Sequence, residues 1–393
     1  MAELPRHRFS NLFDRSSCFF QLIFWSSSVK LVEPWKKPTS TRSYDNLNRL
    51  TSIASGPMEY VYKYNAVNQR TRVDWTDGSL WSFDYDDLGK VTSANRSWTD
   101  GIPVEGQQFG YTFDDIGNRT ETSRNGRTAD YQPNLLNQIV ERQIPGAIDL
   151  KGHAHLEATV TVDLENPTRQ DGGYFHKEVS LDNDGQAATK EVEIVGVRNA
   201  VGPNGEDVVS EVSGELFLRK NPETLDYDDD GNLLEDGQWT YEWNAENRLI
   251  SMETRSELNS IFPRQRLEFG YDWQGRRLKK EVQAWNDNLW EWETVEERNF
   301  HYHRWNLVAE LDDSENLLKS YLWGLDLSGT LEGAGGVGGL LAILDHGTSQ
   351  AYFPTYDGNG NVTALLDMNA EVAALYEYGP FGEKIRAAVR LLN

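Results

Sequence analysis

One five-residue pattern recurs eight times in this chain of 393 residues and restricts its fold more than any other feature. Each copy starts with an aromatic residue, termed the anchor. Asp or Asn follows the anchor directly, and Gly or Asn stands four residues after it. The eight copies are Tyr44–Asn48, Tyr64–Asn68, Tyr85–Gly89, Phe113–Gly117, Tyr227–Gly231, Trp243–Asn247, Tyr271–Gly275 and Tyr356–Gly360. A recurring pattern of this kind indicates a fold built from one repeated structural unit.

The residue types in the pattern describe a strand that runs into a tight turn. Asp and Asn side chains bond to the backbone two residues on and start turns, and Gly and Asn tolerate the left-handed conformation that closes them. Aromatic residues also stand two and four positions before most anchors, as Tyr60 and Tyr62 do before Tyr64. That spacing puts the rings on one face of a strand. The pattern therefore predicts an all-β chain of stacked hairpins.

The repeated pattern resembles the YD repeats of Rhs proteins, toxin-complex proteins and teneurins. The sequences of three segments are similar to the conserved Rhs-associated core: Tyr241–Met252, Tyr321–Gly329 and Tyr356–Glu383. The resemblance covers residues 43–145 and 225–383. It implies a YD-repeat hairpin spiral that forms part of a large hollow β shell. In the family, such a shell encloses a toxic C-terminal domain and delivers it to a target cell.

The repeat is interrupted between the anchors Phe113 and Tyr227. Residues 146–225 contain few aromatic residues and several short β-like runs separated by turn residues, which is typical of a small β-sandwich. We therefore predict four parts of the chain. They are a poorly ordered non-repeat leader at 1–42, YD repeats at 43–145, an inserted β module at 146–225, and YD repeats with a truncated Rhs-associated core at 226–393.

A glycine-rich stretch, Gly333–Gly338, matches the dinucleotide-binding pattern G-x-G-x-x-G. A true fingerprint needs a strand before it and a helix after it. The apolar run that follows reaches only Leu344, which is too short for such a helix. Glycines within sheets mark bulges and corners, so the resemblance implies a bend in the shell at this point.

Other candidate sites are explained by turns and wet strand faces. Asp226–Gly231 matches the first half of a calcium loop, but Gly237 stands where the last Glu ligand is needed. Two His pairs are each predicted to share a strand face, and two ligands do not make a zinc site. Three glycosylation sequons lie in or beside the turns. The His pairs are His153 with His155 and His301 with His303, and the sequons start at Asn95, Asn118 and Asn361.

Composition limits the partners of the chain. Acidic residues outnumber basic ones by 62 to 38, for a net charge of −24, which repels phosphate backbones and anionic lipid. We therefore expect no nucleic-acid partner. The single cysteine, Cys18, excludes a disulfide framework. The apolar run Cys18–Trp25 is too short to span a membrane, and with Gln21 inside it and Asp14 before it, it is a poor signal peptide.

The resemblance implies a non-catalytic structural part of a secreted or surface-located shell from a bacterial polymorphic toxin. Its partners would be a toxin cargo or the remaining shell segments. No catalytic, cofactor-binding or metal-binding residue is predicted. In the family, a segment with an Asp-Pro pair closes the core and cuts the shell from its cargo. Here Gly379 replaces the usual Asp and no Asp-Pro occurs, so we predict a truncated shell without cargo that is not an enzyme.

Two further expectations concern association. An incomplete spiral leaves strand edges and apolar faces uncovered, which predicts self-association. The alternative function is a secreted or cell-surface binding module that recognises carbohydrate or a protein partner. Its contacts would lie in residues 146–225 or on wet strand faces. The sequence identifies neither a toxin cargo nor an export route.

Overall fold

The computed structural model describes residues 39–389, and within them the chain is all-β, as predicted. Two single-turn 3-10 helices, η1 (Asp171–Gly173) and η2 (Ser256–Leu258), are the only helical elements of this part of the chain. The described residues divide into two compact units. Most of the predicted leader, with its apolar run at 18–25, lies outside the described residues.

The first unit comprises Ser79–Glu242 and Glu253–Arg264. Its antiparallel strands form hairpins, and along one of these strands the buried residues Ala94, Arg96 and Trp98 alternate with less buried ones. The strands, in their order in the sheet, are β5 (Ser79–Tyr85), β6 (Val91–Trp98), β7 (Pro103–Phe113), β8 (Arg119–Arg124), β9 (Arg127–Pro133), β10 (Ile139–Arg142) and β17 (Glu223–Thr224), and a second run starts with β18 (Asp226–Tyr227), β19 (Leu233–Glu235) and β20 (Trp239–Trp243).

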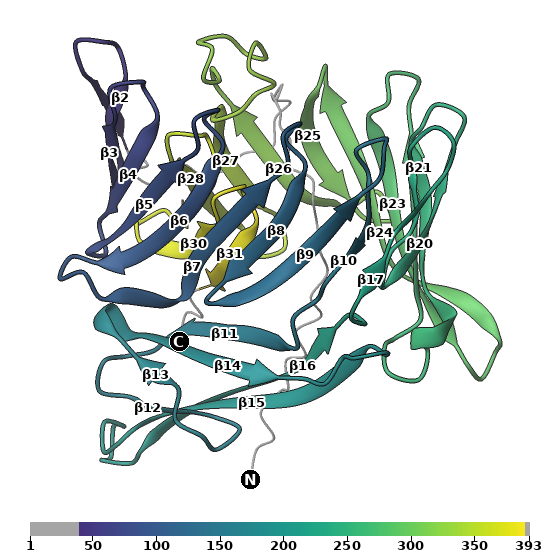
Figure 1. Ribbon diagram of the computed structural model, residues 1–393, viewed down its shortest axis with the longest axis horizontal. Coiled ribbons are helices and arrows are strands. Elements are labelled where there is room, and N and C mark those ends of the chain that lie inside the picture. The colour runs from purple at the N-terminus through teal and green to yellow at the C-terminus, as the bar shows by residue number, and fades with distance from the viewer. Residues whose placement is uncertain (1–38, 390–393) are drawn as a thin grey trace. The chain divides into compact units, whose positions relative to one another are not determined.

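Two three-stranded sheets lie in the chain between β10 and β17 (Figure 1). One has the order β11 (Ala147–His153), β14 (Tyr174–Ser180), β13 (Thr168–Arg169), and the other β12 (Thr159–Val162), β15 (Ala188–Arg198), β16 (Val208–Leu218). The sheets share apolar clusters, in one of which Phe175 packs with Val160 and Val162. The insertion is therefore a small two-layer β-sandwich.

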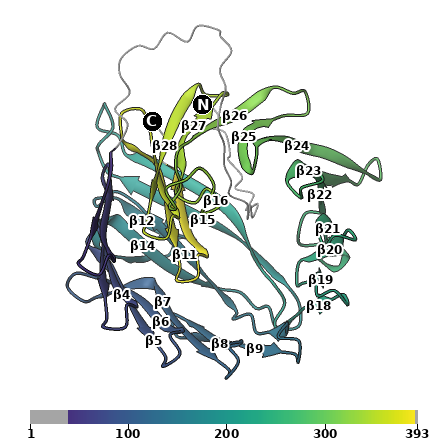
Figure 2. The same ribbon diagram turned by 90° about the horizontal axis from the view of Figure 1, so that it is seen from above.

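The second unit comprises residues 39–78, Trp243–Met252 and the described part of Gln265–Asn393. Its strands also pair with their chain neighbours, and Figure 2 shows the green strands β22 to β26 following one another in order. The strands are β1 (Ser40–Tyr44), β2 (Leu50–Ser55), β3 (Met58–Tyr64), β4 (Arg70–Trp75), β21 (Leu249–Thr254), β22 (Gln265–Tyr271), β23 (Arg277–Asn286), β24 (Glu291–His303), β25 (Asn306–Leu311), β26 (Leu317–Trp323), β27 (Leu340–Asp345), β28 (Gln350–Tyr356), β29 (Val362–Leu366), β30 (Val372–Tyr378) and β31 (Lys384–Val389).

All eight predicted turns share one geometry. In the first, Asp45 Oδ1 accepts hydrogen bonds from the backbone N–H groups of Leu47 and Arg49, both at 2.9 Å. The backbone N–H of Asp45 donates to the carbonyl of Arg49 at 3.0 Å. Asn48 has a positive φ of 61°, and the Gly or Asn at the same position of every other copy also has a positive φ. The residue types therefore meet the hydrogen-bonding and conformational needs of this turn.

Four more turns of the same kind were missed by the sequence pattern. Their anchor positions hold Pro133, Leu311, Leu366 and Tyr378, and only the last of these is aromatic. Asn134, Asp312 and Asp367 cap three of the turns as Asp45 does. In the fourth, which has Gly379 after its anchor, a carboxylate oxygen of Glu383 accepts the N–H of Phe381 instead.

Five tyrosine anchors connect their hairpin to the one before it. The hydroxyl of Tyr64 donates to the carbonyl of Leu50 at 2.8 Å, and Tyr271, Tyr356 and Tyr378 make the same bond at the same distance to Leu249, Leu340 and Val362. Tyr227 makes it to Ile139 at 2.9 Å, although the insertion separates the two residues in the chain. The backbone N–H of Leu225 also donates to the carbonyl of Val140. The hairpin repeat therefore continues across the insertion without a change of register.

Replacing Tyr227 with phenylalanine should lower the free energy of unfolding by about 1 kcal/mol, because one hydrogen bond is lost while the ring stays. Urea unfolding followed by tryptophan fluorescence measures the change. The matched control is Tyr44→Phe at an exposed anchor, where we expect no shift. Equal midpoints for the wild type and Tyr227→Phe would show that the bond does not stabilise the repeat.

Contacts between early and late strands close the second unit. The hydroxyl of Tyr62 on β3 accepts a 2.6 Å hydrogen bond from the backbone N–H of Gly358, in the turn after β28. Arg70 lies 4.3 Å above the Tyr62 ring and donates to the side chain of Asn359 at 2.8 Å. Met58 packs against the apolar cluster of Ala342, Ala351, Phe353, Ala364 and Leu366. The first hairpins of the unit therefore share a core with its last ones.

Candidate functional sites

The glycine-rich stretch is an enlarged version of the repeated turn. In the first turn, Tyr44 pairs with Leu50 and the N–H of Asp45 bonds to the carbonyl of Arg49. In the enlarged turn, Trp323 pairs with Leu340 and the N–H of Gly324 bonds to the carbonyl of Gly339. Residues 324–339 thus stand where an ordinary turn has five residues, between β26 and β27. The segment after Gly338 is a strand, so the helix of a dinucleotide fingerprint is replaced by β27.

The carboxylate of Asp326 fills the centre of this enlarged turn. Its two oxygens accept the backbone N–H groups of Ser328, Ala334 and Gly336 at 2.8, 2.6 and 3.1 Å. They also accept the Ser328 hydroxyl at 2.5 Å. Burial alone would raise the pKa of Asp326, but these hydrogen bonds outweigh it and lower the pKa to about 2. Converging backbone N–H groups form an anion nest, and in this loop a carboxylate of the chain itself occupies it.

Replacing Asp326 with alanine should open the enlarged turn, because three backbone N–H groups lose their acceptor. We expect limited proteolysis within residues 324–339 to become about ten times faster, since the lost bonds to a charged group favour local opening. Mapping the fragments by mass spectrometry measures the change. The control is Asp345→Ala, which removes a carboxylate that accepts the backbone N–H of Thr348 in the next hairpin loop, between β27 and β28. A cleavage rate as slow as that of the wild type would contradict the role given to Asp326.

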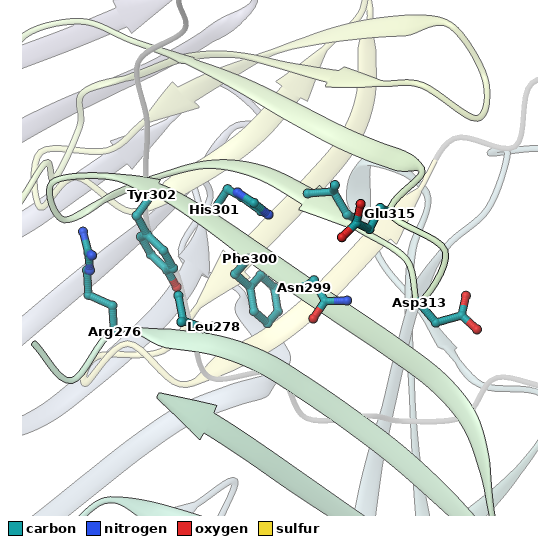
Figure 3. Close-up of a pocket in the computed structure, with 9 residues that line it drawn as sticks. Arg276, Leu278, Asn299, Phe300, His301, Tyr302, Asp313 and Glu315 are labelled. Carbon is teal, nitrogen blue, oxygen red and sulfur yellow. The ribbon is translucent and has the colours of Figure 1, made fainter. Parts of the chain in front are cut away.

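A cavity of about 480 Å³ lies where the ends of β23, β24 and β25 meet (Figure 3). In Figure 3 the rings of Phe300 and Tyr302 extend from β24 toward the strand that carries Leu278, and Asp313 and Glu315 lie on the turn after β25. The nine lining residues are Arg276, Leu278, Asn299, Phe300, His301, Tyr302, Leu311, Asp313 and Glu315. Sequence reasoning singled out only His301 among them, because the cavity depends on which strands become neighbours.

The exposed polar groups of this cavity suit a ligand that donates hydrogen bonds. Arg276 is already engaged, since its Nε and Nη2 atoms lie 2.6 Å from Asp272 Oδ2 and Nη1 donates to the carbonyl of Arg304. Its guanidinium also lies 5.5 Å from the centre of the Tyr302 ring. Exposed His301, Asp313 and Glu315 can exchange hydrogen bonds with a ligand. Aromatic side chains beside a few polar groups are typical of small-molecule sites.

A buried ion cluster joins the insertion to the hairpin sheet within the first unit. The Asp149 side chain on β11 is 2% exposed and accepts hydrogen bonds from Arg127 at 2.5 Å, His176 at 2.8 Å and Asn125 at 3.1 Å. Arg124 approaches the same carboxylate at 3.4 Å. Burial would raise the pKa of Asp149, but the bonds from His176 and Arg127 hold it well below its usual range. Asp149 therefore links the insertion to strands β8 and β9 of the hairpin sheet.

A second buried cluster stands at the other end of the insertion. The side chain of Glu223 is fully buried and bonds to Arg142 through one oxygen. The other oxygen accepts from Arg219 at 2.7 Å and from the backbone N–H of Gly237 at 2.9 Å. Burial would raise the pKa of Glu223, but its bond to Arg142 and the charge of Arg219 lower it. This cluster and the Asp149 cluster hold the insertion against β8 to β10 and β17.

The structure distributes the sequence candidates over turns and exposed strands. β11 ends at His153, so His155 lies beyond the strand and the two imidazoles do not share a strand face, whereas His301 and His303 are both exposed on β24. Asp228 caps its turn by accepting the N–H groups of Asp230 and Asn232. The side-chain amides of two sequon residues, Asn118 and Asn361, donate to turn carboxylates, and the third, Asn95, lies in β6.

Two features are absent from residues 39–389. No three side chains of His, Cys, Asp or Glu come together there in a way that could hold a metal ion. No helix in that range has the length and apolar character needed to cross a membrane.

Comparison with curated proteins finds similarity to three WapA proteins of Bacillus. The chain is 28% identical over 168 residues to the tRNA3(Ser)-specific nuclease WapA of Bacillus spizizenii. It is 25% identical over 166 residues to the tRNA(Glu)-specific nuclease WapA of Bacillus subtilis subsp. natto, and likewise to the tRNA nuclease WapA of Bacillus subtilis. Each match covers 42% of this chain and 6% of the relative. The chain thus spans a small part of the relatives' length.

Similar solved structures are those of toxin-complex proteins. A crystal structure of TcdB2-TccC3 aligns with 90% of this chain and 17% of its own, at a TM-score of 0.35 and 12% identity. The Tc holotoxin pore of Photorhabdus luminescens aligns with 90% and 18%, at a TM-score of 0.32 and 11% identity. No family model matches the chain.

The prediction that the chain is not an enzyme is contradicted by the curated relatives, all three of which are named as tRNA nucleases. That prediction depended on the lack of a recognisable catalytic motif and of the family's self-cleaving segment. Neither bears on nuclease chemistry, because general acids, bases and phosphate-binding groups come together from distant parts of a chain and need no local motif.

Proposed function

We propose that this chain is a section of the wall of an Rhs-type YD-repeat shell, and that the shell belongs to a secreted bacterial toxin of the nuclease type. One observation carries the proposal: the hairpin repeat keeps its register across the insertion, through the bond from Tyr227 to Ile139 and the bond from Leu225 to Val140. The first sheet ends at β17 and a second sheet starts at β18, and these two bonds link the start of the second to β10 of the first. A wall that must retain a cargo needs this connection, because a missing pairing leaves an open edge. A scaffold that only presents a binding site has no such need.

The similarity to WapA supports the second half of the proposal. Those relatives are named for nuclease activity on tRNA and are far longer than this chain. A nuclease is harmful to the cell that makes it, and a shell that keeps it from RNA until delivery would prevent that harm. Delivery of such a nuclease to another cell requires export of the protein that carries it.

The test asks whether the chain can enclose a fused protein and keep it from its substrate. A small ribonuclease fused after Asn393 should be protected from added protease and should cleave RNA more slowly than the free ribonuclease. Unfolding the chain with urea that the ribonuclease tolerates should restore its activity. A matched fusion that carries Asp149→Ala, which weakens the first unit, should protect less. Digestion and activity equal to those of the free ribonuclease would contradict a retaining wall.

The cavity of Figure 3 supports a second candidate function, the binding of carbohydrate. Its rings of Phe300 and Tyr302 suit the apolar face of a sugar, and Asp313 and Glu315 suit its hydroxyl groups. Calorimetric titration with neutral disaccharides tests this function. Binding that is lost in Glu315→Gln and kept in Glu257→Gln, an exposed carboxylate on η2, would support it. If none of the disaccharides produced binding heat, the carbohydrate-binding function would be contradicted.

A further inference from the structure

The repeated turns differ in one side chain that their geometry does not require. Three residues after the anchor, only the backbone N–H is used, and it bonds to the capping Asp or Asn, as Leu88 and Ile116 do at 3.0 and 3.1 Å. The side chain at this position is exposed in all twelve turns. Turn formation therefore leaves the choice of residue open, and a polar residue is the ordinary choice for an exposed position.

The type of residue at this position changes along the chain. The first five turns all have an aliphatic residue at this position, and the next six all have a polar one. The aliphatic residues are Leu47, Val67, Leu88, Ile116 and Leu136, with exposures of 69%, 71%, 75%, 75% and 76%. The polar residues are Asp230, Glu246, Gln274, Ser314, Asn359 and Asn369, and the last turn has Phe381. Exposed aliphatic side chains that cluster in consecutive turns mark an interaction surface.

Three of the aliphatic residues form a row within the first unit, which we name the apolar rim: Leu88, Ile116 and Leu136. Their turns are tied to one another in sequence. Lys90 Nζ donates to the carbonyl of Asp114 at 3.2 Å, and the amide of Asn118 donates to Asn137 Oδ1 at 3.0 Å. Neighbouring turns of one edge are two strands apart, so the side chains of the apolar rim recur about every 9–10 Å.

The charge beside the apolar rim is negative. Asp87 and Asp115 are exposed and directly precede Leu88 and Ile116. Lys90, two residues after Leu88, lies 3.7 Å from Asp86 and also bonds to the neighbouring turn. A second copy of this chain would bring the same carboxylates against these, which disfavours self-association through the rim. A partner with basic residues is complementary.

The spacing of the apolar rim selects the shape of that partner. An α-helix repeats its apolar face every seven residues, or about 10.5 Å, close to the spacing of the rim. Residues three apart in an extended strand span about 10 Å but point to opposite faces. A polyproline helix has a similar repeat, but its ligands dock between aromatic rings, and the apolar rim offers only aliphatic side chains.

We propose that the apolar rim is a docking site for a basic amphipathic helix of a partner protein, with one apolar side chain per heptad against each of the three turns. The probe is a fluorescent three-heptad peptide with Leu at its a and d positions and Lys on both flanks. Two comparison peptides have the same composition in shuffled order and a proline-spaced Leu/Lys sequence. Binding to the full chain is measured by fluorescence anisotropy at physiological salt.

The decisive variant is Leu88→Asn/Ile116→Asn/Leu136→Asn. It should fold, because Asn359 and Asn369 already hold this position in other turns of the same chain. The heptad peptide should bind it at least about tenfold more weakly, since two or three buried aliphatic contacts are lost. Asp87→Asn/Asp115→Asn should weaken binding and reduce its salt dependence. The control Val208→Asn/Val209→Asn/Val212→Asn removes three exposed apolar residues of β16 and should leave binding unchanged.

Four results would overturn the proposal. The first is equal binding of the heptad peptide to the wild type and to the rim variant. The second is equal or tighter binding of the shuffled or proline-spaced peptide. The third is a rim-dependent dimer in light scattering with no effect of the peptide, which would make a second copy the occupant. The fourth is rim-dependent binding of the chain to phosphatidylcholine vesicles, which would make a membrane the occupant of the rim.

Discussion

Asp149→Ala is expected to lower the free energy of unfolding of the first unit by about 3–5 kcal/mol, the usual effect of removing one partner from a buried ion cluster. The carboxylate is buried and shared by Arg127, His176 and Asn125. Without it, the guanidinium and the imidazole lose the acceptor that brings β9 and β14 together. Urea unfolding of the full chain, followed by tryptophan fluorescence, measures the loss. An unfolding midpoint within error of the wild type would show that the cluster does not hold the insertion.

The matched control is Glu178→Gln, which removes an exposed carboxylate bonded to the same arginine, Arg127. We expect it to change stability by less than about 1 kcal/mol, because exposed ion pairs contribute little. The pH dependence gives a second check. The folded pKa of Asp149 is lowered, so its contribution is complete above the unfolded pKa of about 4 and is lost as pH falls through the folded value. The stability difference between wild type and Asp149→Ala should therefore be constant above about pH 5 and shrink below about pH 4.

Tyr62→Ala is expected to destabilise the second unit by about 3–5 kcal/mol, as large aromatic deletions in cores do. Tyr62 is 4% exposed, and its hydroxyl is the acceptor for the backbone N–H of Gly358. The substitution leaves a cavity and a backbone donor without its acceptor, in the contact that joins the first hairpins of the unit to its last. Far-UV circular dichroism during thermal unfolding measures the change.

Two variants separate the causes. Tyr62→Phe keeps the ring and should lower stability by only about 1–2 kcal/mol, the value of the hydrogen bond with its unsatisfied donor. Tyr44→Ala removes an anchor that is 54% exposed on the edge strand β1 and should have a small effect. If Tyr62→Ala were no more destabilising than Tyr44→Ala, the contact between β3 and the turn after β28 would not stabilise the unit.

The turns were predictable from sequence because their physics is local. Asp or Asn after the anchor and a residue tolerant of positive φ four positions on suffice to form the turn, and all eight predicted copies have it. The four copies missed by the pattern break its rules at three positions: the anchor, the capping position, where Gly379 stands in the last turn, and the position of positive φ. Pro133 and Leu311 replace the aromatic anchor, and Glu315 and Ala370 take the positive φ that Gly or Asn usually adopts. The capping side chain and strand pairing on both sides outweigh the local strain there.

The residue directly after the five-residue pattern gives a better sequence signal for these turns. The fifth residue after the anchor often bonds to the capping side chain, as Arg49 does to Asp45 and Asn316 does to Asp312. Polar Gln138 does the same with Asn134, in the turn whose anchor is proline. An Asp or Asn followed four residues later by Asn, Gln, Arg or Lys would have found two of the missed turns without any aromatic residue.

The sites could not be predicted in the same way, because each depends on segments distant in the sequence. Asp326 reaches Ala334 and Gly336 only after the loop has folded around it. The cavity at β23 to β25 needs three strands in register, and the Asp149 cluster needs the insertion to pack on β8 and β9. Sequence patterns report local conformation well, and they do not report which faces of a repeat protein meet.

The insertion enters and leaves the hairpin sheet at adjacent points. Arg142 at the end of β10 pairs with Glu223 at the start of β17, and the N–H of Ile144 donates to the side chain of Asn221. An inserted domain whose two ends lie close together does not force the host strands apart, because β10 and β17 pair directly with each other. An exchange or shortening of the inserted domain would leave these pairings in place, but it would have to supply a new partner for Arg124 and Arg127, which now contact Asp149.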